Sequence, residues 1–569
     1  MTHLALDPVT RVGGQLRVEL ELSGGTVSDA WVSGTGYRGL ERILEGRDGR
    51  DAWLMAQRIC GTGGLAHAVA SVRAVEHALG VTAPANARLL RNILAGTQLI
   101  AEEVAAFYQR QAWDWVDIRS ALTASPSAAS KLAQSLSAWP NATTSYFDSI
   151  RGRLAAIVNS DQPGPFAAMT GHPAYRLSAE ANLLVAAHYF DALEWRRTVL
   201  GIETVLGGKT PHLQTLLVGG MAIATDWGGP SRPVQGEHLW DVVRNSISPL
   251  GAAGLAAVAQ HLDDAKTFVE QVFLPDVLNT MLAYTDLAKV GGGIGHYLAF
   301  GEFPADSSDR PVLALPRGRV MDRDTTRLIE VGPSGVAETT AHAWYAPEAG
   351  GDDLRDPSTG VTVPRYGGPK PPFDALAGRD RYSWVKAPRY EDDPMEVGPL
   401  ARLLVGYASG DAIIQAAVGN AISTLGLAQD GLFGTVGRIV ARAVEATVVA
   451  GRLDGWLSDL RDNMASGEIA MADLTTWDPA SWPSEAQGFA LGESAQGAAG
   501  HWVTIRDGRI AAYQIVDGTT WNASPRDGDG RRGALEAALV GTSVADAGRP
   551  LELLRTIHSF DPCLSCGVH

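Results

Sequence analysis

Apolar and polar residues alternate along the first thirty positions of the chain, which is the pattern of β-strands. The segment "LRVELEL" at 16–22 alternates strictly, "SGG" follows as a turn, and "VSDAWVS" at 27–33 resumes the alternation. Two such runs joined by a glycine turn predict a hairpin. From residue 38 to residue 79 the apolar spacing changes to three and four residues, which predicts helices.

The middle of the chain carries long helical patterns. Residues 85–113 repeat apolar side chains every three or four positions, which predicts one long and mostly buried helix. Residues 178–208 begin with a serine that can cap a helix and end at a pair of glycines, which predicts a second long helix. Further helices are expected at 253–288 and at 411–465.

Residues from about 300 to 395 are rich in Gly, Pro and Asp. They also carry aromatic side chains that need burial, so we expect an irregular insertion of strands and loops and not a linker. These aromatic residues are Trp344, Tyr366, Phe373, Tyr382 and Trp384. After Gly488 short strands return, and "HWVTIRDGRIAAYQIV" at 501–516 predicts a hairpin with Asp-Gly at its turn. Together the elements predict a single large α+β domain over residues 1–569, with central long helices and peripheral small sheets.

Composition and charge exclude several classes of protein. The 569 residues are 45% hydrophobic and 19% charged, which is a globular composition. The formal net charge of −16 argues against nucleic acid as a partner, because phosphate binding needs a basic surface. No apolar run approaches the roughly 20 residues that span a bilayer, so we expect no direct membrane span. The first residues lack the pattern of a signal peptide.

Three cysteines carry the candidate chemistry. Cys60 lies in "RICGTGG", where the second member of a Cys-x-x-Cys pair is replaced by Gly63, and Cys563 and Cys566 form a complete pair near the C-terminus. Thiolates from distant segments suit nickel, iron or zinc. Two alternatives stay open on the residues alone: Cys60 as a small buried apolar residue, and a structural zinc site.

Several blocks of the chain resemble the large (catalytic) subunit of nickel–iron hydrogenases. The resemblance covers most of the chain, and its blocks are jointly specific although no single one is. They are "DPVTR" at 7–11, "YRGLE…GRDGRDAW…QRICG" at 37–61, "GHPAYRL…GGKTPHLQ" at 171–214, "YSWVKAPRY…PMEVGPLAR" at 382–402, "TTWNASPRD" at 519–527 and "DPCLSCGVH" at 561–569.

The resemblance implies a buried nickel–iron centre with carbon monoxide and cyanide on the iron. Cys60 and Cys563 match terminal nickel ligands, and Cys566 matches a thiolate that bridges the two metals. Gly63 stands at the position of the second bridging thiolate, so this chain is similar to a divergent member of the family. Thr519 matches a hydroxyl that hydrogen-bonds a cyanide.

The resemblance also implies a magnesium ion near the C-terminus. Glu41 and His569 match its ligands, and a backbone carbonyl near Ile515 is the expected third. Oxygen ligands suit this hard cation. The alternatives are that Glu41 is a surface helix acid and that His569 is a frayed terminus.

Other positions depart from the family pattern around the metals. Gly13 replaces a glutamate that relays protons, and Gln496 replaces an arginine above the open coordination position. Gln109 and Gln111 stand where histidines are usual. Asp114 and Asp561 are kept, and with Gln496 they are the residues expected to act beside the metals.

His67 and His212 also match family positions. His67 is expected either to face an iron–sulfur partner or to be a core histidine, and His212 has the same ambiguity.

Three functions compete. The first is a divergent hydrogenase that oxidises or produces hydrogen, and it is preferred because the C-terminal ligands are intact. The second is a structural or redox subunit of hydrogenase descent with an altered or nickel-free site and little hydrogen activity. The third is an enzyme with another substrate on the same scaffold.

The resemblance further implies an iron–sulfur small subunit as partner and a higher-order heteromer. With its three cysteines assigned to one site, the chain cannot hold an iron–sulfur cluster itself. Electrons then leave through the partner. The complex is expected in the cytoplasm or at a membrane through partner subunits.

Overall fold

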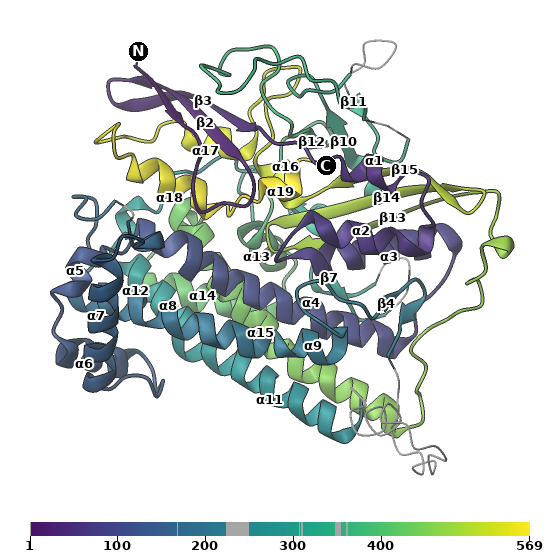
Figure 1. Cartoon of the computed structure of the whole chain (residues 1–569), viewed down its shortest axis with the longest axis horizontal. Helices are drawn as coiled ribbons and strands as arrows, with labels where there is room; N and C mark the ends of the chain where they lie inside the picture. The colour runs from purple at the N-terminus through teal and green to yellow at the C-terminus, as the bar shows by residue number, and fades with distance from the viewer. Residues whose placement is uncertain are drawn as a thin grey trace.

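Four long helices lie at the centre of the structure and pack along one another. The computed structural model describes residues 2–167, 169–223, 250–306, 308, 311–346, 354–359 and 362–569. The central helices are α4 (Ala85–Ala105), α8 (Ala179–Val199), α11 (Ala252–Phe268) and α15 (Thr435–Ala465), as Figure 1 shows. Their Leu, Val, Ile and Ala side chains belong to one continuous core. Burial of this apolar surface is the main force that holds the helices together.

The predicted helix at 85–113 is confirmed over its first three quarters. Its backbone hydrogen-bond pattern changes at Ala106–Gln111 to that of a wider π-helical turn. A 3-10 turn follows at Ala112–Asp114. Such π turns re-aim side chains and occur often at functional sites. The predicted helix at 178–208 begins as expected, because Ser178 accepts a hydrogen bond from the N–H of Ala181, but it breaks at Leu200 into α8 and α9 (Gly201–Gly207).

The other predicted helices are also present, with interruptions. Residues 253–288 form α11, a π turn at Val269–Phe273 and α12 (Leu274–Leu282). Within residues 411–465, α14 (Ala412–Leu425) starts at an Asp411 cap and is separate from α15. Residues 38–79 form three helices: α1 (Leu40–Leu44), α2 (Ala52–Ala56) and α3 (Gly64–Leu79).

Two antiparallel sheets confirm the predicted hairpins. The N-terminal sheet has the order β1 (Thr2–Leu6), β2 (Leu16–Ser23) and β3 (Thr26–Gly34). The C-terminal sheet has the order β13 (Glu485–Ser494), β14 (Gly497–Arg506) and β15 (Arg509–Val516). Its last turn carries Asp507 and Gly508 at positive φ, as the Asp-Gly pair predicts. Helix α3 packs across β13 and β14.

The insertion near 300–395 consists of short strands and loops, as expected. Residues 307, 309–310, 347–353 and 360–361 of this segment lie outside the described residues. Trp344, Tyr382 and Trp384 are buried, but the expectation of burial is wrong for Tyr366, which is 44% exposed. Tyr366 still stacks on Trp384, with ring centroids 5.7 Å apart, so one ring face is covered.

The remaining elements are short and connect these layers. They are α5 (Ile118–Leu122), α6 (Pro126–Leu136), α7 (Thr144–Val158), β4 (Leu216–Leu217), β5 (Gly220–Met221), β6 (Tyr297–Ala299), β7 (Glu302–Pro304), β8 (Leu313–Leu315), β9 (Gly318–Val320), β10 (Val336–Thr339), β11 (Leu354–Arg355), β12 (Ala387–Tyr390), α13 (Pro399–Ala408), α16 (Gly518–Asn522), α17 (Ala534–Leu539), α18 (Leu551–Ser559) and α19 (Leu564–Gly567).

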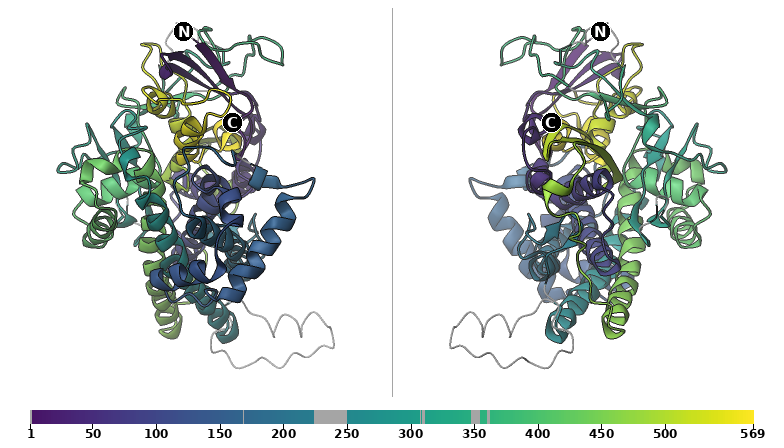
Figure 2. Two further views of the ribbon diagram at one scale, coloured as in Figure 1. Left: turned by 90° about the vertical axis from the view of Figure 1, so that its left-hand side faces the viewer. Right: turned by 90° about the vertical axis from the view of Figure 1, so that its right-hand side faces the viewer.

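The C-terminus lies inside the molecule. Figures 1 and 2 place it between the helical layer and the sheets, whereas the N-terminus lies at an edge. His569 is 1% exposed, which excludes a frayed end. None of the helices among the described residues combines the length and the apolar character needed to cross a membrane.

Candidate metal centre

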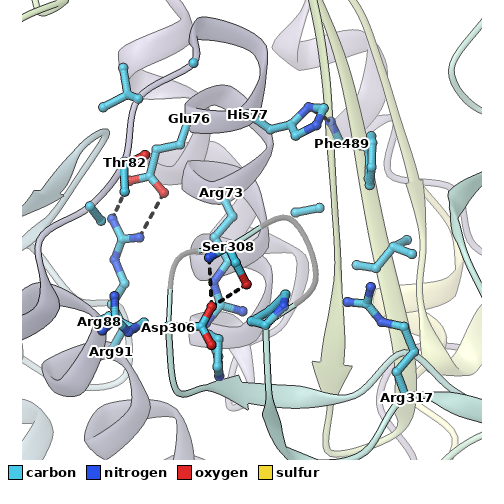
Figure 3. Close-up of a pocket in the computed structure, with 17 residues that line it drawn as sticks. Arg73, Glu76, His77, Thr82, Arg88, Arg91, Asp306, Ser308, Arg317 and Phe489 are labelled. Carbon is cyan, nitrogen blue, oxygen red and sulfur yellow. Dashed lines mark hydrogen bonds and ion pairs between the residues drawn. The ribbon is translucent and has the colours of Figure 1, made fainter.

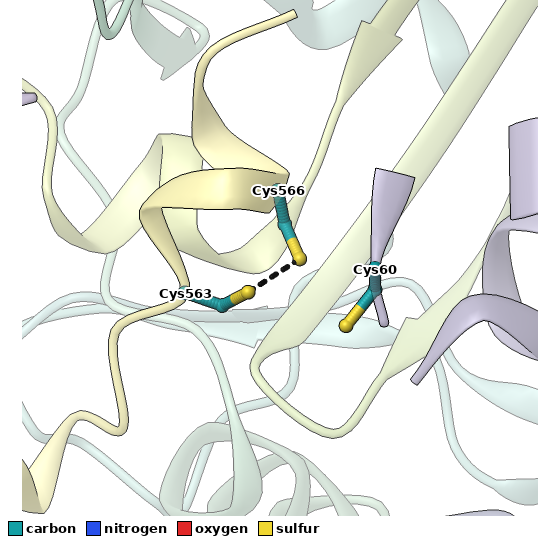
Figure 4. Close-up of side chains that lie close together, drawn as sticks. All are labelled: Cys60, Cys563 and Cys566. Carbon is teal, nitrogen blue, oxygen red and sulfur yellow. Dashed lines mark hydrogen bonds between the residues drawn. The ribbon is translucent and has the colours of Figure 1, made fainter. Parts of the chain in front are cut away.

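The three cysteines converge although 503 residues separate the first from the second. Cys60 follows a 3-10 turn at Gln57–Ile59, and Cys563 and Cys566 flank the first turn of α19. Their three sulfur atoms lie within 4.8 Å of one another, and Figure 4 shows them facing a common space. The sulfurs of Cys563 and Cys566 are 2.8 Å apart, too far for a disulfide.

Backbone and side-chain contacts fix the two cysteine segments to each other. Arg38 donates from one guanidinium nitrogen to the carbonyl of Ile59 and to that of Ser565. Cys563 donates its backbone N–H to the hydroxyl of Thr519 at 3.1 Å. Protein contacts therefore link the two cysteine segments without a bound metal.

The three cysteines differ in the direction in which their surroundings shift their pKa. Hydrogen bonds from Cys563 and Cys566 hold the pKa of Cys60 well below its usual value, and the N–H of Gly63 adds a bond at 3.1 Å. The hydrogen bond with Cys563 raises the pKa of Cys566 well above its usual value. The pKa of Cys563 is also raised, because its bond with Cys60 and its burial outweigh its bond with Cys566. A soft or borderline metal ion that replaces the protons fits this donor set.

Two glycines beside the cluster differ in what a side chain there would meet. A Cβ added at Gly63 would meet only the sulfur of Cys60, at 3.5 Å, and the φ of −92° suits any residue. A Cβ added at Gly13 would lie 2.8 Å from the sulfur of Cys563, because the two residues pair in a short parallel bridge. The backbone therefore permits a cysteine at position 63 but resists a side chain at position 13.

The predicted carboxylates Asp114 and Asp561 lie in one buried network. Asp114 accepts from Arg11 at 2.5 Å and contacts the ring of His558 at 2.6 Å. Burial raises the pKa of Asp114, but the charges of Arg11 and His558 lower it further, so the net shift is downward. Asp561 accepts from Gln496 at 3.1 Å.

Arg110 is a member of this network that the sequence alone did not single out. Its Nη2 atom lies 3.0 Å from Asp561 Oδ2. Arg110 lies on the π-helical turn between Gln109 and Gln111. The sequence drew attention to this turn only through those two glutamines, which stand where the family usually has histidines. Burial lowers the pKa of Arg110, but Asp561 and Glu102 raise it more, so the guanidinium stays charged. A buried cation therefore faces Asp561 although position 496 is uncharged.

The predicted magnesium ligands Glu41 and His569 are both buried, but protein donors already hold Glu41. Its Oε1 accepts from Lys386 and from the N–H of Ile515, both at 2.9 Å, and its Oε2 accepts from Thr362. Nδ1 of His569 has no hydrogen-bond partner among the described residues. The orphaned, buried ring nitrogen of His569 fits a metal ligand, although the ammonium of Lys386 already bonds the carboxylate of Glu41.

The two matched histidines both lie beside the cluster. His212 contacts the carbonyl of Cys60 at 3.0 Å through Nε2. His67 is 1% exposed and points inward, so it is a core histidine in this chain and not a surface one. Burial lowers the pKa of His67 to about 4, so the ring is neutral. Its Nδ1 lies 3.1 Å from Nε2 of His501.

Asp517 is a second residue that sequence reasoning missed. A carboxylate oxygen of Asp517, a ring nitrogen of His67 and the sulfur of Cys566 lie within 4.8 Å of one another. The cue was an acidic residue inside the apolar run "YQIVDGTTW". Burial raises the pKa of Asp517 to about 6.

A separate pocket on α3 does not share these features. Arg73, His77 and Arg317 line it (Figure 3), and none of the three cysteines does. Arg73 pairs with Glu302, and Arg91 forms two hydrogen bonds with Glu76, so acidic partners offset the positive charge of the pocket.

Comparisons with known proteins agree with the site geometry. The family model described as nickel-dependent hydrogenase matches residues 38–569. The Hydrogenase-1 large chain of Escherichia coli strain K12 is 40% identical over 584 aligned residues, covering 100% of this chain and 95% of that relative. The uptake hydrogenase large subunit of Bradyrhizobium diazoefficiens is also 40% identical, with the same coverage of 100% and 95%. The reduced Ni-Fe-Se hydrogenase of D. vulgaris Hildenborough superposes with a TM-score of 0.76 at 31% identity, covering 100% of both chains.

Proposed function

The chain belongs to the nickel-dependent hydrogenase family, and from that premise we propose that it oxidises or produces hydrogen as the large subunit of a nickel–iron hydrogenase complex. The observation that carries the proposal is the convergence of Cys60, Cys563 and Cys566 to within 4.8 Å. Curated relatives over the whole chain are named as hydrogenase large subunits. The function predicted from the sequence motifs agrees with these names.

In this proposal the cysteines divide between two metals. Cys60 and Cys563 would hold nickel, Cys566 would be shared between nickel and iron, and the iron would carry carbon monoxide and cyanide. The bound centre supplies redox chemistry with hydrogen. Thr519 is suited to donate a hydrogen bond to a cyanide ligand. Its hydroxyl oxygen accepts from the backbone N–H of Cys563, and its hydroxyl hydrogen stays free to point elsewhere. His569 and Glu41 are the proposed magnesium ligands.

The proton-handling residues of this chain differ from those of the motif. Gly13 offers no acid, so we propose that the carboxylates Asp114 and Asp561, which match residues beside the metals in the family pattern, handle protons instead. We assign to Arg110 the role of the positive charge that Gln496 lacks, because its guanidinium pairs with Asp561 at 3.0 Å. Charge at this point orients Asp561 and favours anionic groups near the metals. Arg110 is thus a positioning residue.

An iron–sulfur small subunit is the proposed partner. The chain has three cysteines, and all three lie in one cluster, so none remains for an iron–sulfur cluster. The segment 38–67, which carries the first cysteine motif, is the proposed docking region. Within it Ile43 is 43% exposed, which is the kind of apolar side chain that an obligate interface covers.

A second candidate function rests on the substitutions themselves. With Gly63 in place of a bridging thiolate and Gly13 in place of an acid, the chain also suits a hydrogenase-derived redox subunit with little hydrogen activity. Purification of the native complex separates the two. Nickel, iron and hydrogen uptake with an artificial electron acceptor support the first, whereas metal without uptake supports the second. Zinc alone, without cyanide and carbonyl infrared bands, would remove the first and leave the second.

A further inference from the structure

One oxygen of Asp517 has no donor, although it is buried. Asp517 precedes α16, and its Oδ1 caps that helix by accepting from the N–H and the hydroxyl of Thr520, both at 2.8 Å. Its Oδ2 is buried and has no hydrogen-bond partner among the described residues. A buried carboxylate oxygen without a donor is costly unless a cation or a proton satisfies it.

A ring nitrogen that also lacks a hydrogen lies near this oxygen. Tyr513 donates to Ser71 at 2.8 Å, so the tyrosine oxygen accepts from Nδ1 of His501 at 2.9 Å. Nε2 of His501 is then an acceptor, and Nδ1 of His67 donates to it at 3.1 Å. This tautomer, assigned from the network, leaves a lone pair on Nε2 of His67.

The distance between the two acceptors suits an ion between them. Nε2 of His67 and Oδ2 of Asp517 are 4.0 Å apart, too far for a hydrogen bond. Metal ions bind imidazole nitrogen and carboxylate oxygen at about 2.0–2.2 Å, so one ion can reach both atoms. The hydrogen bond from His67 to His501 is the kind that orients a metal-ligating histidine.

Cys566 belongs to two donor groups at once. It forms one group with Cys60 and Cys563, and a second group with His67 and Asp517. A shared sulfur is the arrangement that a two-metal centre needs. Gly63 has room for a side chain beside Cys60 but offers no donor.

From these relationships we infer that His67, Asp517 and Cys566 form a nitrogen, oxygen and sulfur subsite for the second metal of the centre, replacing the thiolate that Gly63 lacks. The inference rests on the proposed two-metal function of the cysteine cluster. Asp517 is then a metal ligand and not only a helix cap, and the second metal keeps three protein donors instead of one.

The test uses the complex purified from its native host with its partner subunit. X-ray absorption at the iron and nickel edges is compared for the unmodified complex, Asp517→Asn and Asp517→Val. We expect the shell of oxygen and nitrogen ligands at one edge to weaken in Asp517→Asn and to lose one ligand in Asp517→Val, where the His67 nitrogen remains. Under a chelator challenge, that metal should be lost at least about tenfold more readily from both variants. His67→Phe should act in the same direction.

Matched controls separate ligand loss from damage to the fold. Asp517→Asn keeps an oxygen able to cap α16, so its metal loss does not arise from helix fraying. Glu536→Gln changes another buried carboxylate with one unpartnered oxygen, in the core beside the N-terminal sheet, and should leave both edges unchanged. Unchanged spectra and unchanged metal retention in Asp517→Val would overturn the inference.

The same measurements keep this inference distinct from the proposed function. A complex that contains nickel and takes up hydrogen, yet is insensitive to Asp517, refutes the subsite alone. A complex that binds a metal dependent on Asp517, yet lacks nickel and hydrogen uptake, supports the subsite and refutes the proposed function.

Discussion

Arg110 and Asp561 form a partly buried ion pair beside the cysteine cluster, with Nη2 and Oδ2 3.0 Å apart. The pair joins a turn of the central helix α4 to the residue that precedes the last cysteine motif. Asp561 adopts a positive φ, so the paired side chain also fixes an unusual backbone position. The geometry ties the helical core to the C-terminal segment through one charge pair.

Loss of Arg110 should harm both stability and activity. The Arg110 side chain is 20% exposed and that of Asp561 is 4% exposed, so Arg110→Leu leaves a buried carboxylate that keeps only the uncharged donor Gln496. Breaking such a pair costs about 3 kcal/mol in unfolding free energy. Thermal unfolding and hydrogen uptake of the complex measure the two effects.

Gln496→Arg in the Arg110→Leu background is the matched rescue for that prediction. It returns a guanidinium to Asp561 from the neighbouring position. Arg110→Leu/Gln496→Lys is the comparison, because lysine supplies the charge without the planar guanidinium. If hydrogen uptake recovers in the arginine variant but not in the lysine variant, the two-point geometry of the guanidinium matters. Full uptake in Arg110→Leu itself would contradict the positioning role.

The two glycines beside the sulfurs should respond differently to the same small change. Gly63→Ala adds a methyl group at 3.5 Å from the nearest atom, so we expect no loss of stability or metal. Gly13→Ala forces a Cβ to 2.8 Å from the sulfur of Cys563, and such overpacking costs about 1–3 kcal/mol. Nickel content and thermal unfolding compare them directly, and equal behaviour of the two variants would count against the described spacing.

Much of the fold followed from periodicity, but the turns within helices did not. The helix at 85–113 was predictable from apolar spacing, yet its change to a π turn at Ala106 was not, because the sequence there keeps helical periodicity. That turn carries Arg110, whereas the family pattern had pointed to its neighbours Gln109 and Gln111, which stand where histidines are usual.

The site was predictable where several motif residues cluster and unpredictable where a single residue acts across the fold. The cysteine motifs indicated that Cys60 and Cys563 meet. Asp517 gave no comparable indication, because its nearness to His67 depends on how β15 leads into α16 and how α3 packs on the sheet. Burial of Tyr366 was wrongly expected: its ring contacts Trp344 and Trp384 and is still 44% exposed.

Thr519→Val should alter the centre without removing a ligand. The change deprives the N–H of Cys563 of its acceptor and removes the hydroxyl proposed to donate to a cyanide. A lost buried acceptor costs about 1–3 kcal/mol. We expect a shifted cyanide band in the infrared spectrum of the complex, and Thr519→Ser should keep the original band. Identical spectra for all three proteins would reject the assignment of Thr519.

Glu536 should make the chain less stable as pH rises from weakly acidic to neutral. Burial raises its pKa in the folded protein from the usual 4.5 to about 7. Between these values the folded state holds more protons than the unfolded state, so stability falls with rising pH at up to about 1.4 kcal/mol per pH unit. Glu536→Gln removes this titration, so its melting temperature should fall less than that of the unmodified protein between pH 5 and pH 8. A parallel fall in both proteins would show that Glu536 is not the group responsible.

Gly63→Cys should improve the metal centre more than it improves turnover. The new thiol has space beside Cys60, so it should raise nickel retention and supply the second bridging thiolate. Turnover should stay low because Gly13 still offers no acid, and loss of one positioned acid or base costs roughly 10²- to 10⁴-fold in rate. Gly63→Ser, which adds a side chain of similar size but no thiol, is the matched control. Hydrogen uptake with an artificial electron acceptor, divided by nickel content, separates occupancy from turnover. If the unmodified complex already matches the uptake of its hydrogenase relatives per nickel, neither Gly63 nor Gly13 limits the reaction, and protons must reach the metals by a route independent of position 13.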